Sequence, residues 1–410
     1  MKKTIKLAVV AALALGATSA FATNGSNMIA TGAKATGMGG VGIGMSHGAE
    51  SALVNPALIT SVEGTEISFG GTLFMPKVEN INDLTGIGST NTSSVSEAKI
   101  NVIPEVSLAS KINENFYMGV GMWGTAGMGV DYRDAVATSQ MNMVTNLQLM
   151  QFGVPLAYKM NNFSAAITPI LQYGSLDINY DATAMGMGKI GSGVAQSLKF
   201  GYNLGIAYEI ASVTLGATYK SQIDMEYNGV LANAMNPMVS GLSGGANSYT
   251  NDSLSTPAEM GVGISYKFNA NTIAFDFKQI KWSAAKGYQD FEWEDQNVFA
   301  VGYQYSAKTW AARLGYNYSK SPISEQTYTG FNSAGLGSGL ANTFNLLGFP
   351  GVVQSHMTVG GSYNLSDKAS VDLAYVYTPE VSNTYTNFLG ADITTKHSQT
   401  ALSAQLNYKF

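Results

Sequence analysis

Apolar and polar side chains alternate with a period of two residues in many successive segments between Thr65 and the end of the chain. Successive side chains of a β-strand point to opposite faces of a sheet, so this alternation predicts strands with one apolar and one polar face. The chain is therefore predicted to be all-β. The final segment shows the pattern best, with one face formed by Leu402, Ala404, Leu406, Tyr408 and Phe410 and the other by Ser403, Gln405, Asn407 and Lys409.

The composition indicates what these strands face. Only 12% of the residues are charged, against about a quarter in soluble domains. The mean hydropathy is nevertheless only +0.05, and no stretch after the N-terminal segment approaches the ~20 continuous apolar residues that a membrane-spanning helix needs. Few charges, 46 glycines and 22 tyrosines, together with strands whose two faces differ, are typical of an outer-membrane β-barrel.

We predict a transmembrane antiparallel β-barrel of about fourteen strands, an even number, as in single-chain bacterial barrels. Short turns such as Asn161-Asn162 and Ser366-Asp367 alternate with long connections. This places the short turns in the periplasm and the long loops outside the cell. The predicted strands are 65–75, 99–111, 115–124, 147–160, 162–179, 198–210, 212–228, 256–268, 271–284, 296–306, 308–320, 354–366, 368–381 and 397–410.

The first 22 residues are interpreted as a removable signal peptide. Lys2, Lys3 and Lys6 precede a short apolar run, Leu7–Leu15, and Ala20-Phe21-Ala22 forms a small-x-small cleavage site. We therefore expect the protein in the outer membrane of a Gram-negative bacterium. The remaining chain is acidic, which argues against nucleic acid as a partner. Cysteine is absent, which excludes disulfides, thiol catalysis and thiolate metal sites.

The stretch that follows the signal peptide matches neither helix nor strand. Gly37–Gly44 reads GMGGVGIG, which costs too much chain entropy for a regular element. Ser46–Leu53 could form a short helix, ended by Asn55-Pro56. Its many apolar residues favour a plug inside the barrel, which we call the hatch, over a disordered tail. The predicted organisation is signal peptide 1–22, hatch with short helices 23–62, and barrel with long extracellular loops 63–410.

Three long connections, residues 181–197, 229–255 and 331–353, are rich in apolar side chains. Surface loops are normally polar, so these loops suggest a landing site for hydrophobic molecules. The alternative, compatible with the first, is that the apolar residues pack the loops together over the barrel mouth. The candidates for capture are Met185, Met187, Leu231, Met235, Met238 and Leu242.

Together these features resemble the FadL family of outer-membrane transporters for long-chain fatty acids and other hydrophobic molecules. The resemblance is most specific near the predicted mature N-terminus and spans nearly all of the chain that follows the signal peptide. The matching segments are GAKATGMGGVGIG, SALVNPALIT, FGYNLGIAYEI (200–210), LSTPAEMGVGISYKF (254–268), AVGYQYSAKTWAARLGYNYSKSPI (300–323) and MTVGGSYNLSDKASVDLAYVY (357–377).

The resemblance implies a barrel closed by the hatch, with no open aqueous pore. It implies that a ligand binds first on the extracellular loops and then inside the barrel, where it displaces the mature N-terminus. The ligand then leaves sideways into the membrane, beside a kinked third strand. Carried onto this chain, the N-terminal gate is Thr23, Asn24 and Gly25, the hatch motif is Asn55, Pro56 and Ala57, and the kink candidates are Gly119, Gly121 and Gly124.

Lumen-facing basic residues are candidates for binding the carboxylate of a ligand, and these are Arg313, Lys220 and Lys278. Alternatively each pairs with a lumenal acid, for which the candidates are Glu259, Asp276 and Asp372. The three histidines have no evident nucleophile motif or orienting group, and no cluster of acids and histidines has metal-ligand spacing. We therefore expect no enzymatic activity, no catalytic residue, no metal and no cofactor.

The expected function is passive uptake of long-chain fatty acids or similar hydrophobic molecules. Uptake of aromatic hydrocarbons is the alternative within this class, and a general porin or a surface adhesin are alternatives from other classes. Besides the hydrophobic ligand, the expected partners are outer-membrane lipid, lipopolysaccharide and the barrel assembly machinery, which the terminal aromatic Phe410 would address. A monomer is expected, because no feature of the sequence demands an oligomer.

Overall fold

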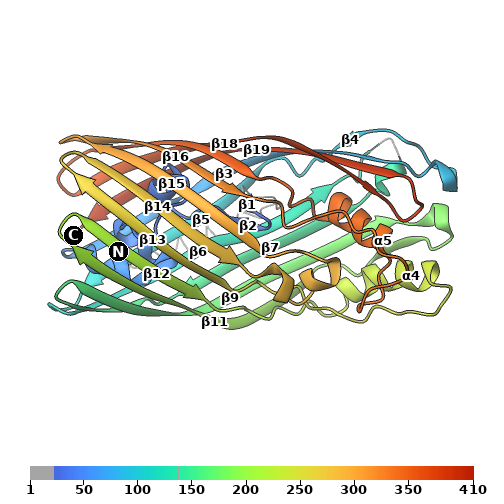
Figure 1. The fold of residues 1–410 in the computed structure, drawn as a ribbon, viewed down its shortest axis with the longest axis horizontal. Coiled ribbons are helices and arrows are strands. Elements are labelled where there is room, and N and C mark those ends of the chain that lie inside the picture. Colours follow the sequence, from blue (N-terminus) through green and yellow to red (C-terminus); the bar gives the residue numbers. More distant parts are fainter. Residues whose placement is uncertain (1–22, 136–137) are drawn as a thin grey trace, which may run out of the picture.

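The structure is a computed structural model that describes residues 23–135 and 138–410. The predicted signal peptide lies outside the described residues. In this part of the chain, fourteen antiparallel strands form a barrel that closes where β19 (Asp392–Lys409) pairs with β3 (Thr65–Asn82). Figure 1 shows the tilted strands from the side. The prediction of an all-β barrel of about fourteen strands is confirmed.

The wall follows the order of the chain. After β3 come β5 (Asn101–Lys111), β6 (Phe116–Asp131), β7 (Val144–Gly153) with its continuation β8 (Leu156–Met160), β9 (Phe163–Asp181), β11 (Ala195–Ile210), β12 (Val213–Lys220), β13 (Glu259–Phe268), β14 (Asn271–Ile280), β15 (Gln296–Ser306), β16 (Trp310–Ser319), β17 (Ser355–Asn364), β18 (Ala369–Thr386) and β19. The short strands β4 (Ser94–Val95) and β10 (Lys189–Gly191) extend the loop end of the wall.

Several strands end at other residues than predicted. β12 stops at Lys220 instead of residue 228, and β14 stops at Ile280 instead of 284. Pro155 interrupts the predicted strand 147–160, since proline cannot donate to a ladder. In contrast β3, β6, β18 and β19 are longer than predicted at their loop ends. The outward residues there are less apolar, so the alternation that predicts a strand is weak.

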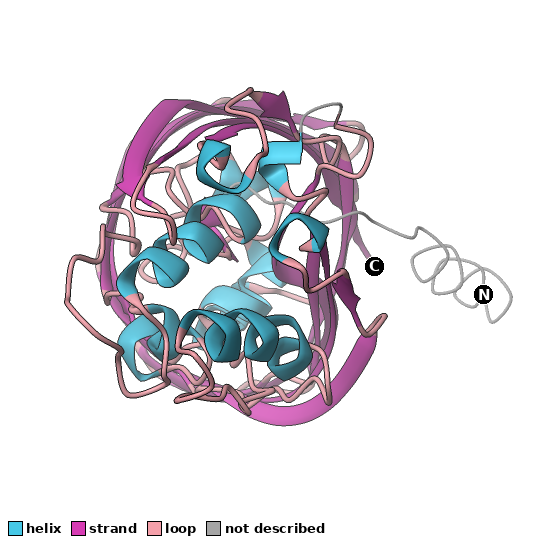
Figure 2. Cartoon of the chain, turned by 90° about the vertical axis from the view of Figure 1, so that its right-hand side faces the viewer, coloured by secondary structure: helices cyan, strands magenta, loops and turns pink. Residues whose placement is uncertain are grey.

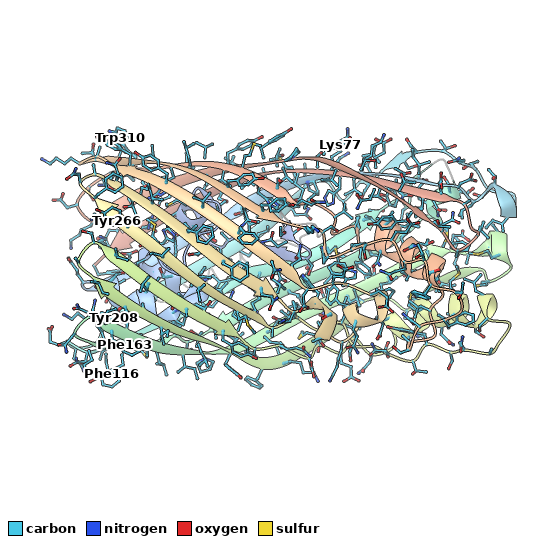
Figure 3. The ribbon with its side chains drawn as sticks, in the orientation of Figure 1. Lys77, Phe116, Phe163, Tyr208, Tyr266 and Trp310 are labelled. Carbon is cyan, nitrogen blue, oxygen red and sulfur yellow. The ribbon has the colours of Figure 1, made fainter. Side chains whose placement is uncertain are left out.

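The outside of the wall is apolar and framed by aromatic rings. Phe116, Phe163, Tyr208, Tyr266 and Trp310 gather at one end of the barrel (Figure 3). The inside is polar, with a buried row on neighbouring strands that includes Asn317, His356, Asp372, Gln399 and Gln405. Leu402, Leu406 and Tyr408 are among the side chains exposed on the outside, as the alternation predicts. The wall therefore presents an apolar face to lipid and a polar face to its contents.

The hatch lies inside this wall. It begins with a hairpin of β1 (Thr23–Asn24) and β2 (Asn27–Met28), continues through α2 (Ala33–Thr36), and ends in a turn-rich segment with η1 (Gly48–Glu50), α3 (Ser51–Val54) and η2 (Pro56–Ser61). The helix expected over Ser46–Leu53 is thus a short 3₁₀ turn followed by one α-helical turn. In Figure 2 the helices lie within the ring of strands.

The glycine-rich run of the hatch packs backbone to backbone against glycines of the wall. A Cβ on Gly37 would lie 2.9 Å from the Cα of Gly360. Likewise Gly39 sits on β16 beside Gly315, and Gly44 sits on β13 at Gly263. Any side chain at these positions would overlap main-chain atoms, which explains why a segment with so little intrinsic structure is rich in glycine.

Loop helices close the other end. α4 (Leu231–Leu242), the 3₁₀ turns η6 (Trp282–Ala284) and η7 (Tyr288–Phe291), α5 (Ser338–Thr343) and the π-turn η8 (Phe344–Gly348) fold over the barrel mouth. Their apolar residues form one large core cluster together with the upper parts of β6, β7 and β9. No helix in the described residues has both the length and the apolarity to cross a bilayer.

We expect Gly315→Val to destabilise the protein by about 1–3 kcal/mol, because the added side chain would collide with the main chain of Met38 and Gly39. Gly361→Val is the matched control, since a Cβ there meets only the carbonyl oxygen of Ala311 at 3.4 Å. The measurement is the temperature at which each purified variant loses its compact mobility on a gel. Equal transition temperatures for the two variants would contradict the tight seat of the hatch.

Candidate functional site

The first described residues form a hairpin inside the lumen. Thr23 pairs with Met28 and Asn24 with Asn27, and Gly25 in the turn has a φ of +65°, which glycine adopts without strain. Thr23, Asn24 and Gly25, the predicted gate, are all buried. The hairpin is therefore held by the barrel on several sides, and each side has its own contacts.

A cluster of three aromatic rings lies against the turn of the hairpin. The ring centroids of Trp282, Tyr288 and Trp293 lie between 4.6 and 5.1 Å apart, within the range of favourable aromatic pairs. A Cβ on Gly25 would lie 2.7 Å from Trp282 and 3.1 Å from Trp293. The hydroxyls of Ser26 and Tyr288 are 3.1 Å apart. Only a glycine fits over these rings in this position.

On a second side the hairpin bonds to β6, the third strand of the wall. Asn27 is paired with Ala126, and the N–H of Gly127 donates to the carbonyl oxygen of Ser26 at 3.1 Å. The ladder between β5 and β6 ends at the pair Glu105–Trp123, so residues 101–104 of β5 and 124–130 of β6 form no ladder with each other within the described chain. We call this interruption the β6 seam.

The path of β6 changes at the same place. Met118 and Val120 are 45% and 53% exposed on the outside, whereas Gly121 to Val130 are buried on both faces except at Thr125. A β-bulge lies between Gly124 and Ala126 in the pairing with β7. Of the predicted kink candidates, Gly124 borders the bulge, Gly121 lies under the Trp123 ring and Gly119 lies in regular ladder. Beyond Gly121 the strand is therefore irregular and covered on both faces, while it stays paired with β7.

A cavity of about 80 Å³ lies beside the hairpin, between the hatch and the wall. By volume it would hold on the order of five waters. Its lining includes Met28 and Ile29 from the hatch, Thr125 from the β6 bulge, and Ile223 and Met260 near the ends of β12 and β13. Displacing the hairpin would enlarge this cavity toward the aromatic cluster.

The cavity contains two lysines. Glu259 bridges one of them to the hairpin, because its carboxylate lies 3.4 Å from Lys278 Nζ and accepts from Asn27 Nδ2 at 2.9 Å. Lys220 lies near this pair but forms no ion pair within 4 Å in the described part of the chain. Asp276 instead accepts the N–H groups of Gly42 and Ile43, both at 2.7 Å. Of the two lysines in the cavity, Lys220 is thus the one without an ion-pair partner in the described part of the chain.

Arg313, the third predicted cation, belongs to a different part of the lumen. It is 4% exposed and pairs with Asp372 at 3.5 Å. Asp372 also lies 3.7 Å from Lys34 of the hatch, and Lys34 pairs with Glu50 at 3.0 Å. These groups hold the hatch to the wall near the periplasmic end. Arg313 thus pairs with a lumenal acid, which was the alternative to binding a ligand carboxylate.

The hatch motif clamps the hatch to β11. Asn55 Nδ2 donates to the carbonyl oxygens of Ile43 at 2.7 Å and of Ile206 at 3.1 Å, and its Oδ1 accepts from the N–H of Ala57. Pro56 begins the 3₁₀ turn η2, where its missing N–H costs nothing. Ala57 is fully buried against Ala207. One side chain therefore joins the glycine-rich run, the turn and the wall.

The predicted capture residues divide into two groups. Leu231, Met235 and Met238 are completely buried in the loop core, so they offer no surface to a ligand outside the cell in this structure. Met185 and Met187 are half-buried against the same core. Only Leu242 is exposed, at 42%. It lines an open groove of about 350 Å³ with Val239, Phe331, Leu340 and Phe388. The first three lie in the connections predicted as a landing site, and Phe388 lies outside them.

Sequence reasoning also missed the aromatic cluster and the wall glycines. The three rings come from one short segment, Trp282–Trp293, which was interpreted as a strand end and a loop. A tryptophan-rich loop next to a short strand is the signal that could have identified it. In the described residues no group of three potential ligands is placed to hold a metal ion.

Comparison with known proteins gives a consistent result. Residues 8–330 match the family model described as outer membrane protein transport protein (OMPP1/FadL/TodX). The chain is 25% identical over 342 residues to a long-chain fatty acid transport protein of Escherichia coli O6:H1. The aligned region covers 69% of this chain and 76% of that protein.

Two solved structures share the fold. A Pseudomonas aeruginosa FadL homologue matches with a TM-score of 0.68 and 17% identity, over 94% of this chain and all of that chain. The toluene transporter TodX of P. putida matches with a TM-score of 0.67 and 16% identity, over 93% of this chain and 99% of that chain.

We expect Asn55→Ala to loosen the hatch by about 1–3 kcal/mol, because it removes the buried donor that joins the Ile43 carbonyl oxygen of the hatch to the Ile206 carbonyl oxygen of the wall. In planar bilayers this variant should show more frequent ion-conducting openings than the wild type. Asn91→Ala, an exposed loop position, serves as the control. Conductance and thermal stability equal to the wild type would show that the clamp does not hold the hatch.

Proposed function

Since the chain belongs to the outer membrane protein transport family (OMPP1/FadL/TodX), whose members carry hydrophobic molecules across the outer membrane, we propose that its substrates are long-chain fatty acids. The observation that carries this proposal is Lys220, a lumenal ammonium without an ion-pair partner within 4 Å in the described residues, which lines the cavity that the N-terminal hairpin covers. A carboxylate in this cavity would supply the missing partner.

Part of the cavity lining suits the acyl chain. Met28, Ile29 and Ile223 lie there among polar residues, and the hairpin separates the cavity from the rings of Trp282 and Trp293. A bare acyl chain in water costs about 0.8 kcal/mol for each CH₂ group. A closed route with apolar lining avoids this cost, and the buried hatch in the lumen leaves no place for a wide aqueous path of the porin type.

Aromatic hydrocarbons are the second candidate substrate class. The cluster of Trp282, Tyr288 and Trp293 favours it, because the space now occupied by the Gly25 turn would place a planar ring against three other rings. The carboxylate of a fatty acid can form an ion pair with Lys220, whereas toluene has no charged group that could. Lys220 therefore distinguishes the two classes.

Capture would take place in the groove beside α4. Leu242 and Phe331 are 42% and 47% exposed there, and exposed apolar side chains around a groove are unusual on a surface that faces water. Most of the methionines that the sequence suggested for capture would instead support this groove from below.

Release would take place through the β6 seam. The Ser26 carbonyl oxygen and Asn27 currently satisfy the β6 edge from inside the lumen. A ligand that takes the place of the hairpin would remove this cover and expose the opening between β5 and β6. Gly124 at the bulge and Ile103, whose side chain a Cβ on Gly124 would meet at 2.5 Å, would then border the exit.

The substrate is tested by measuring the uptake of labelled oleate in cells that lack their own fatty-acid channel. Cells with this protein in the outer membrane are compared with cells without it. We expect uptake with the wild type. Lys220→Met should raise the half-saturating oleate concentration by tenfold or more, since a charge-assisted hydrogen bond contributes about 1.5–3 kcal/mol. Toluene uptake should not change.

Lys308→Met, an exposed lysine near the periplasmic turns, is the matched control and should leave oleate uptake intact. No oleate uptake by a folded wild-type barrel would remove fatty acids as substrates. Equal effects of the two lysine changes would show that Lys220 has no special role.

Linking the hairpin to β6 tests its displacement. The paired residues Asn27 and Ala126 can both be replaced by cysteine in a chain that otherwise has none. We expect the disulfide in Asn27→Cys/Ala126→Cys to abolish uptake and reduction to restore it, with each single variant as the control. Undiminished uptake by the oxidised double variant would mean that the hairpin need not move.

A further inference from the structure

A second interruption of the wall lies between β11 and the chain that continues β12. The ladder between these strands ends at the pair Asn203–Lys220, although β11 begins eight residues earlier in the direction of the loops, at Ala195. The facing segment, residues 221–228, forms only isolated bridges, and both go to its other neighbour, Ile223 to Thr256 and Glu226 to Ser253.

Side chains take the place of the ladder here. The N–H of Ser221 donates to the Tyr202 carbonyl oxygen at 2.9 Å, but the N–H of Tyr202 donates to the Ser221 hydroxyl at 3.0 Å. Further along, the Glu226 N–H reaches the Ser197 hydroxyl at 3.3 Å, and Lys199 and Glu226 are 4.0 Å apart. We call this region, residues 197–202 and 221–226, the β11 seam.

The β11 side of the seam continues the lipid-facing band of the wall. Leu198, Phe200, Tyr202, Leu204, Ile206 and Tyr208 all point outward and are exposed. The ten residue steps from Leu198 to Tyr208 rise roughly 25 Å along the barrel axis for a strand tilted by about 40°, which matches the height of the apolar band of such barrels. Phe200, on the unladdered part, is 81% exposed. On the facing segment the outward residues Asp224 and Glu226 are exposed and charged. The seam therefore lies at the edge of the apolar band, where lipid tails meet the polar surface.

The inner side of the seam opens onto the cavity described above. Tyr202, Ser221 and Ile223 belong to its lining together with Met260, and both Tyr202 and Met260 are 42% exposed on the outside of the wall. Gly201 carries no side chain, and the side chain of Ile223 occupies the space where its Cβ would be. At this point the Ile223 side chain, one main-chain hydrogen bond and two hydrogen bonds to serine hydroxyls close the wall between β11 and the facing segment.

Lys220 stands at the base of the seam, because it is the last residue of the β12 ladder. From this position an amphiphile with its carboxylate at Lys220 can extend its chain either along the hairpin toward Thr125 or outward past Ile223. The same anchor would serve both directions.

We infer that the β11 seam is a second lateral passage, through which a single-chain carboxylate amphiphile exchanges between the cavity and the surrounding lipid. The inference rests on the proposed function, since it uses the same cavity and the same lysine. It differs in its route, because β7 and β9 separate β11 from the β6 bulge in the wall. The passage opens when the Ile223 side chain rotates away from Gly201 and the segment 221–226 separates from β11.

A thiol cross-link across the seam tests the passage. In Lys199→Cys/Glu226→Cys two thiols replace side chains that lie next to each other across the seam. Because the chain has no native cysteine, a thiol reagent reacts only at these two positions. The control, Val301→Cys/Tyr316→Cys, links two outward residues that face each other in the continuous ladder of β15 and β16. A short bis-thiol reagent with a reducible linker closes both, and oleate uptake is measured before linking, after linking and after reduction.

We expect at least a fivefold loss of oleate uptake on linking the seam, full recovery on reduction, and no loss in the control. Oleate with a photoreactive group at its methyl end should also label Tyr202 or Met260 in the unlinked protein. Unchanged uptake after linking, an equal loss in the control, or labelling confined to β6 would overturn the second passage. Failure of the unlinked protein to take up oleate would instead overturn the proposed substrate, so the two failures are distinguishable.

Discussion

A backbone in lipid must have its N–H and C=O groups paired, because each unsatisfied group costs several kcal/mol where no water is present. The closed ladder of fourteen strands in the described chain meets this requirement almost everywhere. Two of its interruptions, beside β6 and beside β11, border the cavity, and both are closed from within or by side chains. These are the places where we propose that a lipid-soluble molecule passes the wall.

One small element connects the two interruptions. The hairpin of Thr23–Met28 satisfies the β6 edge, sits over the aromatic cluster, and through Asn27 and Glu259 contacts the charges next to Lys220. The rest of the hatch is fixed differently, by glycine contacts with the wall and by the Asn55 clamp. The structure thus combines a hatch seated by close main-chain contacts with an N-terminal hairpin held by hydrogen bonds and by packing on the aromatic cluster.

The fold was largely predictable from the sequence, since the alternation of residues such as Leu402, Leu406 and Tyr408 follows directly from the two-faced wall. Strand ends were less predictable. Beyond Lys220 and Ile280 apolar side chains such as Ile223, Met225 and Trp282 continue, but they pack into the loop core instead of facing lipid, and sequence alone does not distinguish these surroundings. For the same reason Met235 and Met238 suggested a surface site although they are buried. Contacts between distant segments, such as Gly25 on Trp282, required the structure.

The central claim is that a carboxylate amphiphile takes the place of the N-terminal hairpin. Hydrogen–deuterium exchange of the purified barrel, with and without palmitate, tests it directly. The account predicts that palmitate accelerates exchange at Asn27 and at Gly127, whose N–H donates to the Ser26 carbonyl oxygen, and leaves the amides of Gly42 and Ile43 on Asp276 protected. Unchanged or slower exchange at the hairpin and at Gly127, with palmitate bound, would contradict it.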